Sequence, residues 1–293
     1  MKEDEARKYP DLMAIVEKKV YPERKTKPGS YSKQWWLFGR RNKEGQRAIA
    51  QCDRVLVTNA QAAAHHAFIF YTPRVVFANS LNVFPLETYS SFCVLQSYTH
   101  EVWARFFSSS MKDDLRYNPS DCFLTFPFPS DWETNPTLES AGKTYYEFRA
   151  DLMVRHNQGL TATYNRFHDP DEANPDILKL RSLHAECDRA VLDAYGWQDI
   201  PTDCEFRLDY EDEPDSSSKR KKPWRYRWSE TIHDRVLARL LELNQERAEA
   251  EKLGDKPKRR KEPANLDTSD SKLPPAQKQL DLIPPDKEQL GFF

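Results

Sequence analysis

Apolar residues recur with a helical period near the start of this chain and with a strand-like period further on. Between residues 3 and 20 they stand three or four positions apart, which predicts an amphipathic helix that the following prolines end. The predicted buried face of this helix consists of Leu12, Ile15, Val16 and Val20.

Short apolar runs replace this pattern between residues 45 and 107. The runs are rich in valine, phenylalanine and tyrosine and are separated by polar turns, which favours strands of an antiparallel sheet. The four runs are RVLVTN at 54–59, AFIFYT at 67–72, RVVFAN at 74–79 and FCVLQS at 92–97. A short helix is predicted over 97–107, because Val102, Trp103 and Phe106 return at helical spacing.

Three further helices are predicted in the second half of the chain. The first covers 141–159, the second has Asn174 as its N-cap with Pro175 at its first position and ends at Gly196, and the third begins near Ser229 or Thr231. Their apolar positions are Tyr145, Phe148, Leu152 and Met153 in the first, Leu180, Leu183, Cys187, Val191 and Ala194 in the second, and Ile232, Val236, Leu237, Leu240, Leu241 and Leu243 in the third.

These elements predict an α+β fold in which a mostly antiparallel sheet with helices is followed by a helical layer. Beyond about residue 253 the sequence is mainly lysine, proline, aspartate and serine, which predicts a disordered C-terminal tail. The predicted parts are an N-terminal helix with its linker at 1–28, an α+β domain at 29–135, a helical region at 136–252 with an exposed loop at 209–222, and the tail at 253–293.

The composition says more about the cellular compartment of the protein than about its activity. The five cysteines are an odd number without a C-x-x-C pair, which argues against a disulfide framework or a zinc ribbon and favours a reducing cytoplasm. A membrane partner is not expected, because no stretch approaches the roughly 20 apolar residues of a membrane span. The net charge is only −2, so nucleic-acid binding would have to come from local basic patches.

A search for catalytic motifs predicts no catalytic residue in this chain. Asn118-Pro119 is followed by Ser120-Asp121, so the Asn-Pro-Pro-aromatic loop of an adenine methyltransferase is incomplete, and an Asx-type turn is the preferred interpretation. Asp11 and Glu17 lie on different sides of a helix and cannot share one metal ion. The histidines at 65–66, 168 and 184 lack further ligands at metal-site spacing, so no metal site is predicted either.

Two stretches interleave basic residues with tryptophan and tyrosine, a composition that suits contact with nucleic-acid phosphates. The alternative, in which the aromatic residues are core and the basic residues are merely solvated, remains open. The first stretch places Arg40, Arg41 and Lys43 after Trp35 and Trp36, and the second combines Lys221, Lys222, Arg225 and Arg227 with Trp224, Tyr226 and Trp228.

Three longer stretches carry a family resemblance: LQSYTHEVWARFFSSSMKDDLRYNPSDCFLTFPFP, GLTATYNRFHDPDEANPDILKLRSLHAECDRAVLDAYGWQD and PWRYRWSETIHDRVLARLLELNQERAEAE. Together they resemble the carboxy-terminal half of the large single-chain adenine-specific DNA methyltransferases of type II G restriction-modification and related phage-defence systems. The resemblance covers roughly residues 8 to 250. It implies a target recognition domain that chooses a DNA sequence, whereas the amino-terminal half of that family, which carries the methyltransferase motifs, has no counterpart here.

The resemblance also implies roles for individual residues. Lys112 and Asp114, just ahead of the Arg116-Tyr117 step, would read a base pair in the major groove. A lysine can donate to guanine and a carboxylate can accept from cytosine, so these two residues suit a G·C pair. Arg116 and the basic residues of the two aromatic stretches would contact the DNA backbone. A solvated lysine-aspartate turn is the open alternative at 112–114.

Partners and cofactor follow as expectations from the same resemblance. The partners would be double-stranded DNA and a methyltransferase domain or subunit supplied in trans, and S-adenosylmethionine would bind to that partner rather than to this chain. Two tail segments, Gln279–Ile283 and Gln289–Phe293, look like peptides that dock into bacterial sliding clamps. Two alternatives stay open, namely that the chain is itself a site-specific adenine methyltransferase, or that it is an interaction scaffold unrelated to nucleic acid.

Overall fold

The computed structural model divides into two units, Met1–Arg47 and Ala48–Phe293. The residues it describes are 2–38, 42–108, 110–111, 114–208 and 224–254. The predicted α+β class with an antiparallel sheet is confirmed. The loop predicted at 209–222 lies outside the described residues, as does the tail predicted at 253–293 except for residues 253 and 254, which belong to a helix. None of the helices in the described ranges is long and apolar enough to cross a membrane.

The first unit consists of short helices packed around one tryptophan. They are α1 (Glu3–Ala6), α2 (Pro10–Lys19), α3 (Tyr21–Arg24) and α4 (Ser30–Lys33), and α5 (Lys43–Ile49) crosses the boundary to the second unit. Ala6, Met13 and Trp35 form the core. The predicted apolar face of the N-terminal helix is wrong for Leu12 and Ile15, which are 61% and 54% exposed, whereas Val16 packs against this core. The helix buries the side that carries Met13 because Trp35 lies there.

The sheet of the second unit has three antiparallel strands, β1 (Val55–Asn59), β2 (Ile69–Tyr71) and β3 (Leu81–Phe84), with β1 in the centre. The strands predicted at 54–59 and 67–72 are confirmed. The strand predicted at 74–79 is wrong, because that run is a surface turn in which Val76 is 82% exposed, and β3 follows it.

The run at 92–97 lies mostly in helix α6 (Tyr89–Gln96) rather than in a strand. Thr88 caps this helix by accepting a hydrogen bond from the Ser91 amide, and every residue from Ser90 to Gln96 is buried. A helix buried on all sides has no polar face, so its sequence lacks the helical period. Helix α7 (Tyr98–Phe107) follows and confirms the helix predicted at 97–107, although Phe106 is exposed rather than buried.

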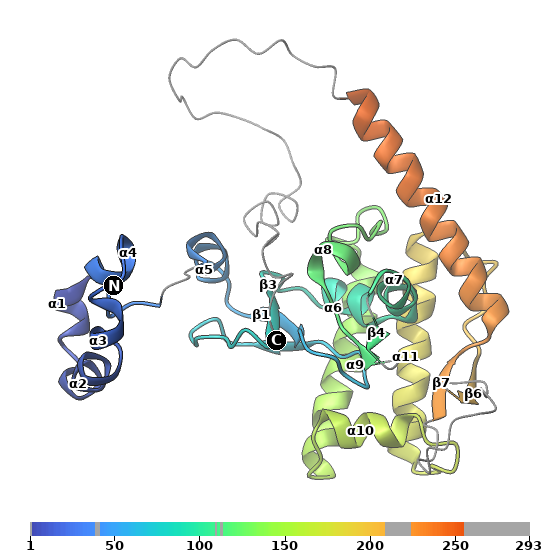
Figure 1. Ribbon diagram of the computed structural model, residues 1–293. Coiled ribbons are helices and arrows are strands. Elements are labelled where there is room, and N and C mark those ends of the chain that lie inside the picture. The colour runs from blue at the N-terminus through green and yellow to red at the C-terminus, as the bar shows by residue number, and fades with distance from the viewer. Residues whose placement is uncertain (1, 39–41, 109, 112–113, 209–223, 255–293) are drawn as a thin grey trace, which may run out of the picture. The chain divides into compact units, whose positions relative to one another are not determined.

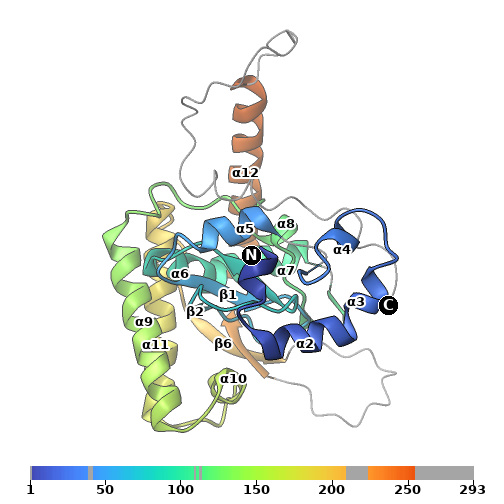
Figure 2. The same cartoon turned by 90° about the vertical axis from the view of Figure 1, so that its left-hand side faces the viewer.

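A helical layer covers one side of this unit. Its long helices are α9 (Pro136–Arg155), α11 (Pro175–Ala194) and α12 (Glu230–Gly254), with the short α10 (Leu160–Phe167) between the first two. Helices α9 and α11 lie side by side in both views (Figures 1 and 2), and α9 packs across α6. The predicted cap of α11 is confirmed, since the Asn174 side chain accepts a hydrogen bond from the Asp176 amide.

Three smaller elements complete the unit: a hairpin of β4 (Ser110–Met111) and β5 (Asp114–Leu115), helix α8 (Pro119–Cys122), and a two-stranded ribbon of β6 (Cys204–Leu208) and β7 (Trp224–Trp228). The ribbon was not predicted from the sequence. The core runs without interruption from the sheet through α6 and α7 to α11 and α12, so the sheet and the helical layer share one hydrophobic interior.

Candidate nucleic-acid interface

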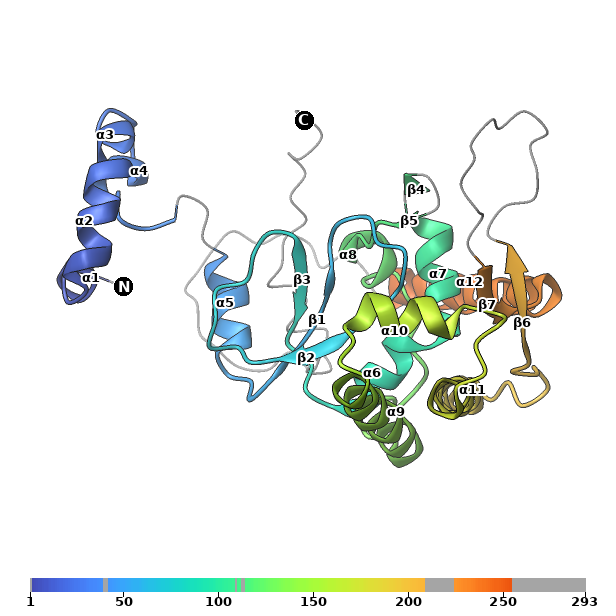
Figure 3. The same ribbon diagram turned by 90° about the horizontal axis from the view of Figure 1, so that it is seen from below.

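The hairpin β4–β5 carries the two residues expected to read a base pair. Its strands pair through Ser110 with Leu115 and through Met111 with Asp114. Asp114 therefore starts β5, whereas Lys112 and the side chain of Asp114 lie outside what the structure describes. Figure 3 shows the hairpin on the side of the unit away from α9 and α11.

The base of this hairpin is fixed to the loop between β1 and β2. Leu115 and Ala63 exchange two backbone hydrogen bonds, each of 3.2 Å, and the Leu115 side chain is buried. This pairing extends the hairpin by one bridge into the body of the unit. The position of β5 is therefore set by the main chain as well as by side-chain packing.

Tyr117, two residues after Leu115, attaches the C-terminal end of the hairpin to two other elements, α7 and β3. Its hydroxyl lies 2.8 Å from Nε2 of the buried His100 on α7. Its carbonyl oxygen accepts a hydrogen bond of 2.9 Å from the Asn82 side chain on β3. The hairpin base thus rests on three separate elements, namely the β1–β2 loop, β3 and α7.

The groups beneath the hairpin are electrically neutral near pH 7. Burial raises the pKa of the Tyr117 hydroxyl well above its usual value and lowers the pKa of His100 well below its usual value. Burial also lowers the pKa of His66, whose Nε2 donates a hydrogen bond of 3.0 Å to the Leu95 carbonyl. These packed, uncharged side chains support the hairpin from below.

The aromatic run Phe126–Pro129 anchors the same segment to the helical layer. Phe126 packs edge-on against His100, with 4.5 Å between ring centroids. The Pro127 carbonyl accepts a hydrogen bond of 2.9 Å from the Tyr195 hydroxyl, and the Phe128 carbonyl accepts one of 2.7 Å from Arg247 on α12. The hairpin, its scaffold and the helical layer therefore form one body.

The Asn118-Pro119 step is a helix cap. The Asn118 side chain accepts a hydrogen bond from the Ser120 amide at the start of α8, with Pro119 at the first helical position. This local geometry agrees with the predicted turn, in which the asparagine satisfies backbone groups.

The predicted backbone-contact residues are placed unequally. Arg116 is exposed directly after β5, and Arg227 on β7 is half-buried. Arg225 is only 8% exposed, which leaves little of its surface for contact with a phosphate. Lys43 lies in α5, where its side chain is not described, and the residues outside the described ranges are Arg40, Arg41, Lys221 and Lys222.

The tryptophans of the two basic stretches divide between core and surface. Trp35 is buried in the first unit and Trp228 in the second, which is the packing that the alternative interpretation expected for them. Trp224, at the outer end of β7, is instead 42% exposed. Composition alone could not have separated these cases.

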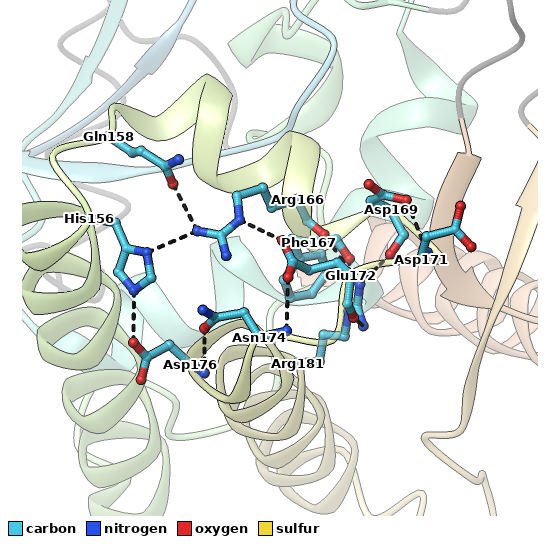
Figure 4. Close-up of polar contacts among 10 residues, drawn as sticks. All are labelled: His156, Gln158, Arg166, Phe167, Asp169, Asp171, Glu172, Asn174, Asp176 and Arg181. Carbon is cyan, nitrogen blue, oxygen red and sulfur yellow. Dashed lines mark hydrogen bonds and ion pairs between the residues drawn. The ribbon is translucent and has the colours of Figure 1, made fainter.

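A polar network fixes the turn between α10 and α11, within the second of the stretches that carry the resemblance (Figure 4). Arg166 donates from Nε to Glu172 at 2.6 Å, and from Nη1 to Gln158 at 3.1 Å and to His156 Nδ1 at 3.0 Å. His156 in turn donates from Nε2 to Asp176 at 2.8 Å. The network joins the end of α9, the end of α10 and the start of α11.

Arg181 stabilises the same turn through hydrogen bonds to the backbone of the turn. Its guanidinium donates to the carbonyls of Phe167 at 2.9 Å and Asp169 at 2.7 Å. The hydrogen bond from His156, followed by that from Arg155, lowers the pKa of Asp176, so its carboxylate stays ionised. The polar residues of this stretch therefore fix the turn between α10 and α11.

A small polar cavity of about 10 Å³ lies where the β1–β2 loop meets α7, α10 and α11. Burial opposes ionisation of Glu101 on its wall, but the neighbouring Arg105 outweighs this and lowers the pKa of the carboxyl to about 2. His65 and His168 stack across the cavity, with 5.3 Å between ring centroids. Among the described residues no group of histidine, cysteine and acidic side chains is arranged to hold a metal ion.

The segment that contains the hairpin and its supports matches a known protein family. Residues 2–130 match the MmeI target recognition domain. The matched segment contains the sheet, α6, α7 and the β4–β5 hairpin with its aromatic anchor, and it ends just before α9 begins at Pro136. This match confirms the resemblance to a target recognition domain that the sequence suggested.

A solved structure of the Type IIL restriction-modification enzyme MmeI in complex with DNA is similar in fold to this chain. The TM-score is 0.51 at 18% sequence identity, over 80% of this chain and 26% of that chain. This chain therefore spans about a quarter of the length of that enzyme, and the likeness extends beyond the matched segment into the helical layer. No curated protein matches the chain.

Proposed function

We propose that this chain binds double-stranded DNA sequence-specifically, as the specificity part of an adenine-N6 DNA methyltransferase in a restriction-modification and phage-defence system. The observation that carries the proposal is the β4–β5 hairpin, which lies within the segment matched to the MmeI target recognition domain and is fixed at its base by Ala63, Asn82 and His100. A reading element needs such support, because discrimination between bases depends on side chains held in a fixed geometry.

The base-reading residues in this proposal are Lys112 and Asp114. The pairing of Met111 with Asp114 leaves two residues between the strands, so Lys112 belongs to the connection and Asp114 to the first position of β5. A lysine ammonium donating to guanine O6 and N7, together with a carboxylate accepting from cytosine N4, would select a G·C pair.

Phosphate contacts would hold the duplex in register without reading it. Arg116 is the first candidate, because it is exposed directly beside the hairpin. Arg227 and the basic residues at 40, 41, 43, 221 and 222 are further candidates, whereas the burial of Arg225 makes it a poorer one.

Methyl transfer would be carried out by another chain or domain, with S-adenosylmethionine bound there. The support for this part is that the chain spans 26% of MmeI and carries no recognisable methyltransferase motif in its sequence. The alternative is that this chain is itself an adenine methyltransferase, and binding of S-adenosylmethionine to the purified chain would favour it.

The tail segments Gln279–Ile283 and Gln289–Phe293 are proposed to dock on a sliding clamp, since each presents a glutamine followed by apolar residues. A pull-down with purified clamp tests this separately. Deletion of residues 275–293 should abolish capture, and equal capture of the full and shortened chains would exclude the proposal.

The central experiment is selection of bound duplexes from a randomised library by the full chain, followed by sequencing. Lys112→Glu combined with Asp114→Arg should change the preferred base at one position while affinity for duplex DNA is kept. An unchanged base preference with intact binding would show that residues other than Lys112 and Asp114 read the DNA sequence. Absence of any salt-dependent binding to duplex DNA would contradict the proposed function itself and favour an interaction scaffold.

A further inference from the structure

Helix α2 carries a wider apolar stripe than the core of its unit covers. Met13 is buried in that core, and Val16 packs against it. Leu12 and Ile15 belong to the same stripe, because residues three or four positions apart are neighbours on a helix, yet both are more than half exposed. One edge of the stripe is therefore covered and the other edge is bare.

Exposed apolar side chains are concentrated in the first unit. Among the described residues, six of the eighteen large apolar side chains that are exposed lie within 2–38, namely Tyr9, Leu12, Ile15, Tyr21, Tyr31 and Phe38. The buried core of the same segment consists of Ala6, Met13 and Trp35. Single exposed apolar residues are ordinary, but a small unit that exposes more large apolar side chains than it buries gains stability when they are covered.

Charged side chains flank the bare edge of α2 and indicate what covers it. Asp11 lies four positions before Ile15 and Lys18 lies three positions after it, so both neighbour Ile15 on the helix surface. Both side chains are exposed. The carboxylate of Asp11 makes this surface unsuited to DNA phosphates, which lysines alone would attract. A protein surface with both signs of charge fits better.

The four residues Asp11, Leu12, Ile15 and Lys18 form the α2 edge, and this edge is complementary to itself. If two copies of α2 lie antiparallel about a two-fold axis midway between Leu12 and Ile15, Leu12 of one copy meets Ile15 of the other. At a rise of about 1.5 Å per residue, Asp11 of one copy and Lys18 of the other then differ by only about 3 Å along the helix axis, within reach of a lysine side chain. Symmetry forms the same ion pair twice.

We infer that the α2 edge is a self-association surface through which two copies of this chain form an antiparallel, two-fold symmetric dimer. The contact involves a helix of ten residues, which is small for a protein interface, so the dimer should be weak and reversible, with a dissociation constant in the micromolar range. The inference does not depend on DNA binding. If the proposed function holds as well, the dimer carries two β4–β5 hairpins.

Sedimentation equilibrium of the full chain over a range of concentrations tests the dimer. The average mass should rise with concentration from the 34.4 kDa of one copy toward twice that value. Leu12→Gln combined with Ile15→Gln should raise the dissociation constant by at least about tenfold, because the centre of the contact is lost. Val154→Gln is the matched control, since Val154 is an exposed apolar residue on α9, and it should change nothing.

Charge reversal tests the antiparallel arrangement. Asp11→Lys places two lysines opposite each other at both ends of the contact, and Lys18→Asp places two aspartates there, so each variant alone should stay monomeric where the wild type is dimeric. An equal mixture of the two variants should dimerise again, because each copy then meets the opposite charge. The double variant Asp11→Lys with Lys18→Asp should also dimerise.

A wild-type chain that stays monomeric at all concentrations would overturn the inference and leave the α2 edge to a different protein. A dimer that survives Leu12→Gln with Ile15→Gln would place the contact on another surface. Failure of the two charge variants to complement each other would exclude the antiparallel pairing. A lower urea midpoint of the double glutamine variant at monomeric concentration would show that the edge already packs within the chain. None of these results bears on sequence-specific DNA binding, which duplex selection measures separately.

Discussion

Arg149 on α9 donates a hydrogen bond of 2.6 Å from Nη2 to the carbonyl oxygen of Phe68, a residue 81 positions earlier in the chain. The guanidinium is buried, and its Nη1 donates to Gln96 at 3.2 Å and to the Tyr164 hydroxyl at 2.9 Å. One side chain thus links the helical layer to the segment that leads into β2. Aromatic rings, including that of Phe92 at 5.1 Å, surround its charge.

Arg149→Met should therefore destabilise the protein by about 2–4 kcal/mol, because the Phe68 carbonyl and the Tyr164 hydroxyl would lose a buried donor. Urea unfolding measures this change. Arg155→Met is the control, since the ion pairs of Arg155 lie at the surface and its loss should change stability far less. Equal effects of the two substitutions would show that the buried hydrogen bonds contribute little.

Gly142 on α9 should not tolerate a side chain. A Cβ atom there would lie 2.1 Å from the Tyr89 carbonyl oxygen and 2.9 Å from Cβ of Cys93, so α9 would have to move away from α6. Gly142→Ala should cost about 1–3 kcal/mol or more of stability, measured by urea unfolding. Gly159→Ala is the control, because nothing lies within 4 Å of the added carbon and the backbone φ of −84° suits alanine.

Tyr117→Phe should loosen the base of the hairpin. The substitution removes the hydroxyl that pairs with His100 and leaves Nε2 of this buried ring without its partner. The expected loss is about 1 kcal/mol of stability, together with faster amide hydrogen exchange at Leu115, whose amide bonds to Ala63. Unchanged exchange at Leu115 would show that the contact between Tyr117 and His100 does not contribute to the rigidity of the hairpin.

Arg116→Gln tests the phosphate contact predicted beside the hairpin. If Arg116 neutralises one phosphate, the slope of log affinity against log salt should fall by about 0.9, and the preferred DNA sequence should not change. Lys143→Gln removes a positive charge from α9, on the other side of the unit, and should leave the slope unchanged. A change in sequence preference by Arg116→Gln would instead make it a reading residue.

Local interactions account for the elements that sequence predicted well. Helix α11 has its cap at Asn174, a proline at its first position and Gly196 after its end with a φ of 78°, all of which depend on neighbouring residues. Helix α6 could not be predicted from its apolar period, because elements packed around it bury every residue from Ser90 to Gln96. Its one local signal was Thr88, which caps it.

The candidate site shows the same division. The hairpin segment could be singled out from its residues, but its supports could not, because Ala63, Asn82 and His100 come from three distant parts of the chain. In the ribbon, the alternation of tryptophan, tyrosine and arginine at 224–228 is a strand signal that was interpreted as a basic patch. The alternation would also place the aromatic residues in the core and the arginines in solvent, whereas Arg225 is buried and Trp224 is exposed.

Stability should fall as the pH falls below about 6.5, the pKa of a histidine in the unfolded chain. Burial lowers the pKa of His66, and that of His100 further, so both rings stay neutral in the folded protein while the unfolded chain takes up protons. The free energy of unfolding then decreases by up to about 1.4 kcal/mol per pH unit for each of these rings. Asp188 opposes this trend, because burial raises its pKa and the folded state gains a proton there first.

Urea unfolding at a series of pH values between about 7.5 and 5 measures this slope. His100→Asn should reduce it by about one proton, because the neutral amide has no proton to gain on unfolding. The substitution should also lower stability at neutral pH, where the contact with Tyr117 is changed. The sign of the slope is the decisive part. Stability that rises on acidification through this range would contradict the prediction. A slope that His100→Asn leaves unaltered would mean that His100 gains its proton while the protein is still folded.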